Sequence, residues 1–536
     1  MRAIAFVFLS MVLGASFAQE ASFSISVVEV TEQIEGPGIQ SFVSARIEDK
    51  VLFLGGRTDG LHRRQPWASF QEVGNNTTAY VLDLGTGETW EASLEGLEVS
   101  LFEQLQSTNQ QFIQNEGLLI TTGGYGYSGQ SQDHITFPGL VVIECEPLIE
   151  AILQGLSGDS LLEFFHRIED PYFAVTGGYL GWMDGVYYLA GGQYFEGRYN
   201  PMGPDHGPGF TQEYSERIKR FALEETDGTW SFTALETWEG GEDLHRRDYN
   251  MVPQIFPGGV NGFTMFSGVF QISEDVPWLN SVNVNEDGFE LNNDFDQMLS
   301  QYHSAHMPVY DEQSEAMHTI FFGGMSRFYY NDGELWDDPN VPFVTTISRV
   351  TRHADGSMTE LKIGDMPDLL GSSAEFIPDP SVPSVFSGII DLQSLPEEPV
   401  LVGHIFGGIE SSQPNIFFIN NGTESEATQR VFEVYVHNGA TGIEEVPVLA
   451  EDYFHPVLYP NPSTGEVTLE FRSPSADEVV CELHDSTGKF IETLVVTDPV
   501  SDWHAYKMDL SEYAAGIYFI RLASRGKSTD LRVVLQ

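Results

Sequence analysis

Short apolar runs that end in a glycine pair recur along most of the chain. Five runs end in Gly-Gly and a sixth, degenerate copy ends in Ser267-Gly268; the runs occupy residues 51–56, 118–124, 186–192, 263–268, 319–324 and 404–408. Each run is short, rich in β-branched and aromatic residues and bounded by turn residues, which predicts a buried strand rather than a helix. Where such a strand ends, glycine lets the backbone turn sharply and approach its neighbours. Six copies predict six similar units in one repeat domain.

The segments between these runs are long and also contain strands. The last glycines of successive copies lie 56 to 84 residues apart, whereas a minimal propeller blade has about 50 residues, so we expect long loops. Two copies continue with a second strand and a turn that precedes a tryptophan, at 80–83 with Trp90 and at 218–221 with Trp230. This pattern resembles the Kelch family. The resemblance implies an all-β fold in which residues 21–438 form a six-bladed Kelch-type β-propeller, similar to the central domain of galactose-oxidase-like proteins.

Two further patterns concern individual blades. Residues 147–168, which follow Cys145, have Leu and Phe at helical spacing, and this predicts a helical insertion in place of the usual strand and turn of the second blade. Residues 23–30 alternate between apolar and polar positions. Because a propeller must close its ring or leave an open sheet edge, we expect this segment to be the outer strand of the last blade, paired with 431–436.

A smaller unit follows an acidic stretch at 439–455, which has no clear strand period and is typical of an exposed linker. Residues 456–536 alternate in short strands separated by Pro, Asn and Gly turns, which predicts a small antiparallel β-sandwich. The Tyr-Pro-Asn-Pro-Ser-Thr-Gly opening at 459–465, the Asp-Ser-Thr-Gly-Lys turn at 485–489 and the Gly-Ile-Tyr strand at 516–518 resemble, in order and position, a type IX secretion C-terminal sorting domain. That resemblance implies contact with the type IX secretion machinery, followed by release or surface attachment.

The N-terminus predicts export. Residues 1–18 have the basic, apolar and small-residue regions of a secretory signal peptide, with cleavage expected after Ala18. No later segment has about 18 uninterrupted apolar residues, so we expect no transmembrane segment in the mature chain. The predicted location is the cell's surroundings or the outer-membrane surface, reached through the periplasm. Cys145 and Cys481 are the two cysteines and fall in different predicted domains, so no intrachain disulfide is expected.

The net charge narrows the range of partners. Against 79 Asp and Glu there are 25 Lys and Arg, which gives a formal net charge of −54. A field of this sign repels nucleic acids and anionic membrane surfaces. Divalent cations, cationic partners and neutral glycans remain as partners, although solubility in salty water explains the composition better.

Candidate binding residues lie in loops that we expect to converge on one face of the propeller, either just after a glycine pair or just before a blade's innermost strand. In a chain with so few cations, the two Leu-His-Arg-Arg clusters at 61–64 and 244–247 are prominent. The candidates are Arg63, Arg64, Tyr125, Gln193, Tyr194, Arg246, Arg247, His303, His306 and Arg327. The planar guanidinium of arginine presents several N–H donors, and aromatic rings stack on sugar faces, so these groups would suit carboxylates or sugars. The interpretation that we favour is that these arginines neutralise acidic neighbours and hold blades together.

Metal and cofactor motifs are weak. The pairs His303/His306 and His62/His245 have no identifiable third ligand, and a metal site needs at least three. Residues 283–288 imitate a calcium loop, but a plain hairpin turn explains them better. We therefore expect no cofactor, with Ca²⁺ as the weaker alternative.

Common enzyme signatures are missing from the sequence. Some Kelch-like enzymes are copper oxidases that need a cysteine crosslinked to a tyrosine, and the surroundings of Cys145 do not match that pattern. Phosphate-loop, serine-hydrolase-elbow and zinc-protease motifs do not occur. The favoured hypothesis is a binding propeller, secreted or displayed on the surface, that recognises a glycan, a polymer or an envelope protein through its loop face. The alternatives are a carbohydrate-active or sugar-acid-modifying enzyme, with acid and base drawn from the candidates above, and a passive structural or adhesive component.

Overall fold

The computed structural model describes residues 22–30, 34–203, 207, 209–331, 333–439, 446–447, 454, 456–472, 479–486, 488–497, 503–524 and 527–536. The predicted signal peptide at 1–18 and most of the predicted linker at 439–455 lie outside the described residues. Within the described residues, no helix is both long enough and apolar enough to cross a membrane.

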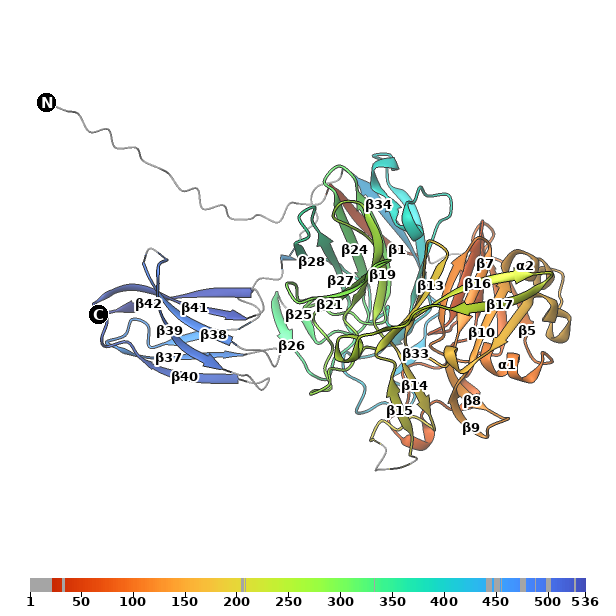
Figure 1. The fold of residues 1–536 in the computed structure, drawn as a ribbon, viewed down its shortest axis with the longest axis horizontal. Helices are drawn as coiled ribbons and strands as arrows, with labels where there is room; N and C mark the ends of the chain where they lie inside the picture. The colour runs from red at the N-terminus through yellow and green to blue at the C-terminus, as the bar shows by residue number, and fades with distance from the viewer. Residues whose placement is uncertain are drawn as a thin grey trace.

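In the described part of the chain, six antiparallel sheets with four main strands each form the blades of a propeller (Figure 1). From the inner to the outer strand, the first three blades are β2 (Val43–Ile47), β3 (Lys50–Leu54), β4 (Thr78–Asp83) and β5 (Thr89–Ser93); β6 (Gln111–Asn115), β7 (Leu118–Thr122), β10 (Gly139–Glu144) and β11 (Phe165–Glu169); and β12 (Tyr179–Met183), β13 (Val186–Ala190), β16 (Arg217–Thr226) and β17 (Thr229–Ala234). The last three are β19 (Asn250–Phe256), β20 (Val260–Phe266), β21 (Ser281–Asn285) and β22 (Gly288–Asn292); β23 (Ala305–Asp311), β24 (Ala316–Phe322), β27 (Thr346–Arg352) and β28 (Met358–Asp365); and β29 (Glu375–Pro378), β31 (Val400–Phe406), β34 (Val431–Asn438) and β1 (Phe23–Glu29).

The innermost strands form a closed ring. Strands β2, β6, β12, β19, β23 and β29 contact one another in this order, and β29 contacts β2. The N-terminal strand closes the last blade, because β1 pairs with β34 and places Ile25 opposite Val436. The predicted six-bladed fold and the predicted pairing of the first and last strands of the propeller are both confirmed.

The glycine pairs lie where neighbouring blades meet. In the second blade, Gly123 and Gly124 have φ values of +64° and +89°, and the Gly124 N–H donates to the Val175 carbonyl of the next blade at 3.0 Å. A Cβ on Gly123 would lie 1.9 Å from that carbonyl oxygen. The second glycine of the other four intact pairs donates in the same way, to the carbonyls of Ser107, Arg246, Leu370 and Ile39. Glycine is thus required by the close approach of one blade's backbone to the next.

Short elements extend the blades. On the loop side lie four hairpins: β8 (Tyr125–Ser128) with β9 (Asp133–Thr136), β14 (Gln193–Glu196) with β15 (Thr211–Tyr214), β25 (Phe328–Asn331) with β26 (Glu334–Asp337), and β32 (Ile409–Ser411) with β33 (Ser425–Ala427). Strand β18 (Trp238–Glu239) joins the third blade, and β30 (Ile390–Asp391) and β35 (Val446–Pro447) join the fifth. The 3-10 segments are η1 (Pro66–Ala68), η2 (Glu72–Gly74), η3 (Gly158–Phe164), η4 (Pro171–Phe173), η6 (Gly241–Leu244), η7 (Phe386–Gly388) and η8 (Leu392–Ser394).

Helical structure is shorter than the sequence predicts. Helix α1 (Val99–Leu105) precedes the second blade, and α2 (Cys145–Leu153) forms where the insertion was predicted, with Leu148 and Ile152 buried. The prediction was wrong at 165–168, because these residues form β11 and pair with β10. Backbone pairing at the outer position of the sheet, with Phe165 buried, outweighs the helical spacing of Leu and Phe.

The C-terminal unit consists of two antiparallel sheets. One contains β36 (Val457–Tyr459), β37 (Glu466–Arg472) and β40 (Trp503–Asp509); the other contains β39 (Phe490–Thr497), β38 (Val479–Asp485), β41 (Gly516–Ser524) and β42 (Lys527–Leu535). Leu469 of the first sheet and Leu483, Ile520 and Leu522 of the second are fully buried in one core. The predicted small antiparallel sandwich is confirmed.

Candidate functional site

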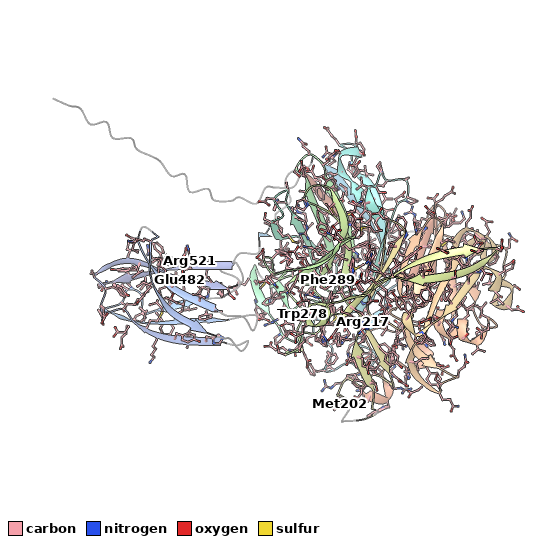
Figure 2. The ribbon with its side chains drawn as sticks, viewed as in Figure 1. Met202, Arg217, Trp278, Phe289, Glu482 and Arg521 are labelled. Carbon is pink, nitrogen blue, oxygen red and sulfur yellow. The ribbon has the colours of Figure 1, made fainter. Side chains whose placement is uncertain are left out.

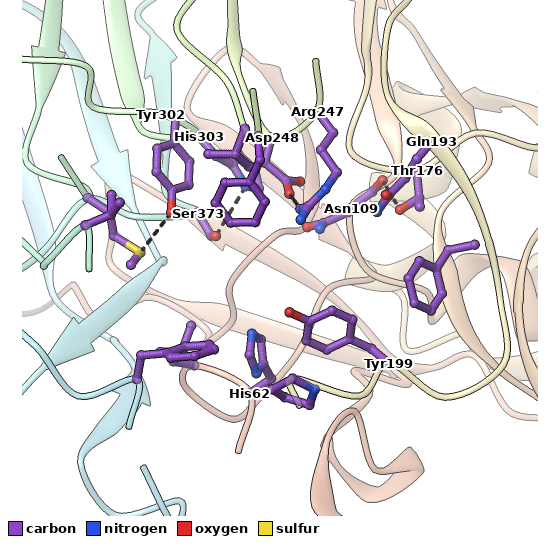
Figure 3. A pocket seen from close by; sticks show the side chains of 18 of the residues that line it. His62, Asn109, Thr176, Gln193, Tyr199, Arg247, Asp248, Tyr302, His303 and Ser373 are labelled. Carbon is purple, nitrogen blue, oxygen red and sulfur yellow. Dashed lines mark hydrogen bonds and ion pairs between the residues drawn. The ribbon is translucent and has the colours of Figure 1, made fainter. Parts of the chain in front are cut away.

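A cavity of about 940 Å³ lies on the loop face of the propeller, and every blade contributes to its lining. Two kinds of segment line it, namely residues that follow a glycine pair and residues that precede an innermost strand. Figure 3 shows Asp248, His303 and Ser373 on one side of this space and His62 and Tyr199 on the other. Convergent loops from all blades place side chains that are distant in sequence around one volume.

The floor of the cavity is built on six backbone positions, one in each blade, that lie two residues before the innermost strand. All six have a left-handed backbone conformation, with φ between +46° and +65°; we call them the floor ring, and they are Ser41, Asn109, Gly177, Asp248, His303 and Ser373. Backbone N–H groups of the ring donate to the carbonyl of the ring residue one blade earlier, at 2.7 Å from Asp248 to Gly177 and 2.8 Å from Ser373 to His303. Non-glycine residues rarely adopt this conformation unless the surroundings impose it.

The floor ring is tied to the loops above it. In every blade, the residue before the ring residue forms a β-bridge with the residue after the glycine pair; the pairs are Gln40–Arg57, Thr108–Tyr125, Thr176–Gln193, Arg247–Val269, Tyr302–Met325 and Ser372–Ile409. The same local geometry therefore fixes both kinds of lining segment, which preorganises the cavity.

Polar groups dominate the floor. His303 Nδ1 lies 3.4 Å from Ser373 Oγ, and burial lowers the pKa of His303. Arg247 forms an ion pair with Oδ2 of Asp248, and its Nε donates to the Tyr214 hydroxyl at 3.1 Å. The buried oxygens Asn109 Oδ1 and Asp248 Oδ1 have no hydrogen-bond partner within the described structure. Buried polar atoms are normally paired, so these two acceptors are candidates for ligand contacts.

Aromatic groups form the opposite wall. The His62 ring lies 4.9 Å from the Tyr199 ring and 5.6 Å from the Phe70 ring, measured between centroids. Burial lowers the pKa of His62 to about 4, so this ring is neutral at pH 7. The Tyr125 ring packs against the Phe70 ring, and its hydroxyl donates to the Gly197 carbonyl at 2.8 Å. Near the opening, Met202 is 48% exposed on the loop between β14 and β15 (Figure 2).

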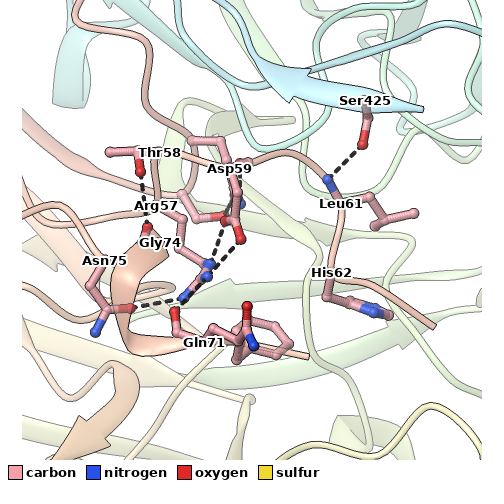
Figure 4. Close-up of polar contacts among 12 residues, drawn as sticks. Arg57, Thr58, Asp59, Leu61, His62, Gln71, Gly74, Asn75 and Ser425 are labelled. Atoms are coloured by element: carbon pink, nitrogen blue, oxygen red, sulfur yellow. Dashed lines mark hydrogen bonds and ion pairs between the residues drawn. The ribbon is translucent and has the colours of Figure 1, made fainter. Parts of the chain in front are cut away.

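The lining cation Arg57 is fully engaged by its neighbours (Figure 4). Its Nε and Nη2 donate to the two carboxylate oxygens of Asp59, both at 2.7 Å, and Nη1 donates to Asn75 Oδ1 at 2.8 Å. Nη2 also donates to the Gln71 carbonyl at 3.0 Å. Arg57 therefore stabilises the long loop after the first glycine pair, because a bidentate carboxylate pair fixes both partners.

Four of the ten predicted site residues line the cavity: Tyr125, Gln193, Arg247 and His303. The other six lie elsewhere. Arg63 is exposed, Arg64 packs over the Phe418 ring at 4.7 Å, and the Tyr194 hydroxyl donates to Glu196.

The remaining three lie in other surroundings, Arg246 and Arg327 buried and His306 half-buried. Arg246 donates to the carbonyls of Ser267 and Asn280 and lies 4.8 Å from the Trp278 ring. Arg327 pairs with Asp337 at 2.8 Å. His306 lies on β23, where its Nδ1 is 2.9 Å from the Ser304 carbonyl.

The sequence prediction missed most of the floor ring and the aromatic wall. A signal for the ring was present, since Ser41, Asn109 and Gly177 each lie 15 residues before the last glycine of their blade's pair. The same distance is 20, 21 and 35 residues in the other blades, because turns and insertions between their strands differ in length. No comparable spacing identifies Phe70 or Tyr199, which belong to loops without a repeat.

The cavity can bind by hydrogen bonding and ring packing. Among the described residues, no group of three or more His, Cys, Asp or Glu side chains could hold a metal ion. Residues 283–288 form the hairpin between β21 and β22, as predicted. Both cysteines, Cys145 and Cys481, are buried as free thiols.

Comparison with known proteins identifies the C-terminal unit. Residues 457–536 match the family described as a secretion system C-terminal sorting domain. The chain thus carries the predicted type IX sorting domain, which indicates secretion to the cell surface or beyond.

Two solved structures resemble most of the chain weakly. One, described as "Structure of YjhT", has 12% identity and a TM-score of 0.40, over 74% of this chain and 96% of that chain. A fungal alcohol oxidase of the AA5 family, solved in complex with copper, has 12% identity and a TM-score of 0.35, over 94% of this chain and 98% of that chain. Comparison with curated proteins gives no match. Likeness at this level gives no information on activity.

Proposed function

We propose that this chain is a carbohydrate-binding Kelch-like propeller, exported through type IX secretion and either released or held at the cell surface, that holds a glycan in the loop-face cavity without chemistry of its own. The observation that carries the proposal is the contrast between the two sides of the cavity. One side offers the polar floor ring, and the other offers aromatic rings. Sugars present hydroxyl groups on their edges and C–H groups on their faces, and both can be satisfied in such a space.

The state of the titratable groups favours binding over catalysis. Arg57 and Arg247 are each paired with a carboxylate, and the Tyr125 hydroxyl is bonded to backbone. Burial keeps His62 neutral. A guanidinium paired with a carboxylate stays charged and can position a ligand, and a tyrosine hydroxyl that donates to a backbone carbonyl does not direct its proton at a substrate.

The test is a glycan array probed with the full chain, followed by calorimetry on each hit. Two variants remove one side of the cavity each: Asn109→Gly keeps the left-handed conformation while deleting the amide, and Tyr199→Ala removes an aromatic ring. We expect each to weaken binding by about tenfold or more, since each removes a buried contact. The control is Asp227→Gly, which changes an exposed residue of the same backbone conformation, with φ of +52°.

Three results would contradict the proposal. Binding that is equally strong in both cavity variants would place the glycan elsewhere on the molecule. Failure of every glycan to bind would favour a protein partner or a passive structural role. Conversion of a bound glycan into a product, followed by chromatography, would make the chain an enzyme.

A further inference from the structure

We infer that the cavity selects sugars that are neutral or carry an amino group and discriminates against sugars that carry a carboxylate. The inference rests on the proposed function and specifies its ligand class. Two observations carry it. The arginines that line the cavity already bind carboxylates of the protein, and two oxygen atoms on the floor have no hydrogen-bond donor in the described structure.

The cations that line the cavity are already neutralised. The Nε and Nη2 atoms of Arg57 donate to the two carboxylate oxygens of Asp59, both at 2.7 Å. Arg247 is ion-paired with Asp248, donates to the Tyr214 hydroxyl, and has its guanidinium 5.2 Å from the centre of the Phe270 ring. No other Lys or Arg belongs to the lining within the described structure. A sugar carboxylate would therefore meet no free guanidinium fork, which is the group best suited to bind it.

The acceptors on the floor point to a ligand that donates hydrogen bonds. Asn109 Oδ1 and Asp248 Oδ1 are buried and lack partners in the described structure. Gly177 is the floor-ring residue between them, and its lack of a side chain makes room for Asp248 Oδ1, because a Cβ there would lie 2.6 Å from that oxygen. Hydroxyl and ammonium groups can donate to both oxygens, whereas a carboxylate can only accept.

Charge repulsion also disfavours sugars that carry a carboxylate. The lining also contains Asp275, and the whole chain carries a formal charge of −54. A second carboxylate brought next to Asp248 in a buried site would raise the free energy of the complex, unless one of the two took up a proton. Because Arg247 already balances the charge of Asp248, an ammonium group would gain its electrostatic attraction from Asp275 and from the negative charge of the whole chain.

The experiment measures affinity by calorimetry for matched sets of sugars. Each set contains the neutral sugar, its 2-amino form and its uronic acid, in the glucose, galactose and mannose series, as monomers and as short oligomers. We expect the neutral or amino member to bind about tenfold or more tightly than the uronic acid of the same set.

Asp248→Asn tests the origin of the selectivity. The change removes the carboxylate and releases Arg247, so we expect uronic acids to gain about tenfold in affinity relative to their neutral partners. The control is Asp227→Asn, which removes the same charge from an exposed turn with the same sign of φ. Asn109→Asp provides a second variant should the first fail to fold, and we expect it to weaken uronic acid binding further while neutral sugars still bind.

The outcomes separate the inference from the proposed function. A uronic acid that binds the wild-type protein more tightly than its neutral partner overturns the inference and leaves glycan binding in place. Equal affinity throughout each set also overturns it. Failure of every sugar to bind overturns both the inference and the proposed function.

Discussion

Glu375 begins the innermost strand of the last blade, two residues after Ser373 of the floor ring. Burial raises the pKa of its carboxyl to about 8. Two residues from other innermost strands are also kept neutral at pH 7: burial raises the pKa of Tyr179 and lowers that of His306 to about 4, and the Tyr179 oxygen lies 3.5 Å from His306 Nε2. The innermost strands thus carry ionisable groups in uncharged forms, which avoids the cost of unpaired buried charge.

Replacing Glu375 with Gln should make stability less dependent on pH. The folded protein keeps the carboxyl protonated up to a pKa of about 8, whereas the unfolded chain ionises it near 4.5. The contribution of Glu375 to the free energy of unfolding is therefore fully present below pH 4.5, and it is lost as the pH rises to 8. Thermal and denaturant unfolding should show Glu375→Gln close to wild type at pH 4.5 and more stable by about 2–4 kcal/mol at pH 8. Glu290→Gln, an exposed change on β22, is the control, and a pH-independent difference for Glu375→Gln would disprove the assignment.

The adjacent residues Arg246 and Arg247 show how much of the site the sequence alone could predict. The rule that residues before an inner strand reach the loop face selected His303 and Arg247, and both line the cavity. It also selected Arg246, which is fully buried and directed away from the cavity. Adjacent residues of an extended segment point to opposite sides, so the rule could find the segment but not the face. Which of the two arginines faces the cavity depends on the bridge between Arg247 and Val269, and that pairing has no sequence signature.

At the scale of elements, ring closure was predictable because both partners alternate. In β1, Phe23 and Ile25 face the core while Val28 is 47% exposed, and β34 supplies Val434 and Val436 on the buried side. The outer strand of the second blade was not predictable, because β11 follows a helical insertion and contains few strand-forming residues. Pairing with β10 determines its structure, and that contact is non-local.

A charge placed on the buried side of β1 should open the last blade. We expect Ile25→Asp to lower the free energy of unfolding by about 3 kcal/mol or more, because a carboxylate would replace an apolar side chain opposite Val436. Val28→Lys, which places a charge on the exposed side of the same strand and opposite Glu433, should cost less than about 1 kcal/mol. Thermal unfolding followed by circular dichroism measures both, and hydrogen exchange of β34 localises the effect. Equal destabilisation by the two variants would mean that β1 does not close the ring.

At the scale of the molecule, the acidic composition leaves a surface more negative than the residue counts suggest. Among the described residues, burial removes six arginines from the surface but only four acidic residues; the arginines are Arg46, Arg57, Arg246, Arg327, Arg349 and Arg352, and the acidic residues are Glu103, Asp296, Asp311 and Glu360. Arg57 and Arg327 are paired with carboxylates, whereas Arg246 donates to backbone carbonyls. Asp and Glu number 79 against 25 Lys and Arg, so the net charge of the chain stays strongly negative however these groups pair. Repulsion among the remaining carboxylates opposes the compact state.

This repulsion predicts that added salt stabilises the full chain. Raising NaCl from about 10 mM to about 150 mM shortens the screening length from about 30 Å to about 8 Å, so repulsion between distant surface carboxylates falls sharply. We expect the Tm to rise by about 5 °C over this range in differential scanning calorimetry. CaCl₂ at the same ionic strength distinguishes screening from site binding. Equal effects of the two salts would fit screening of a dispersed charge, whereas a much larger effect of calcium would mean that carboxylates bind the ion directly. A Tm that falls or stays constant with NaCl would show that ion pairs, rather than repulsion, dominate the surface electrostatics.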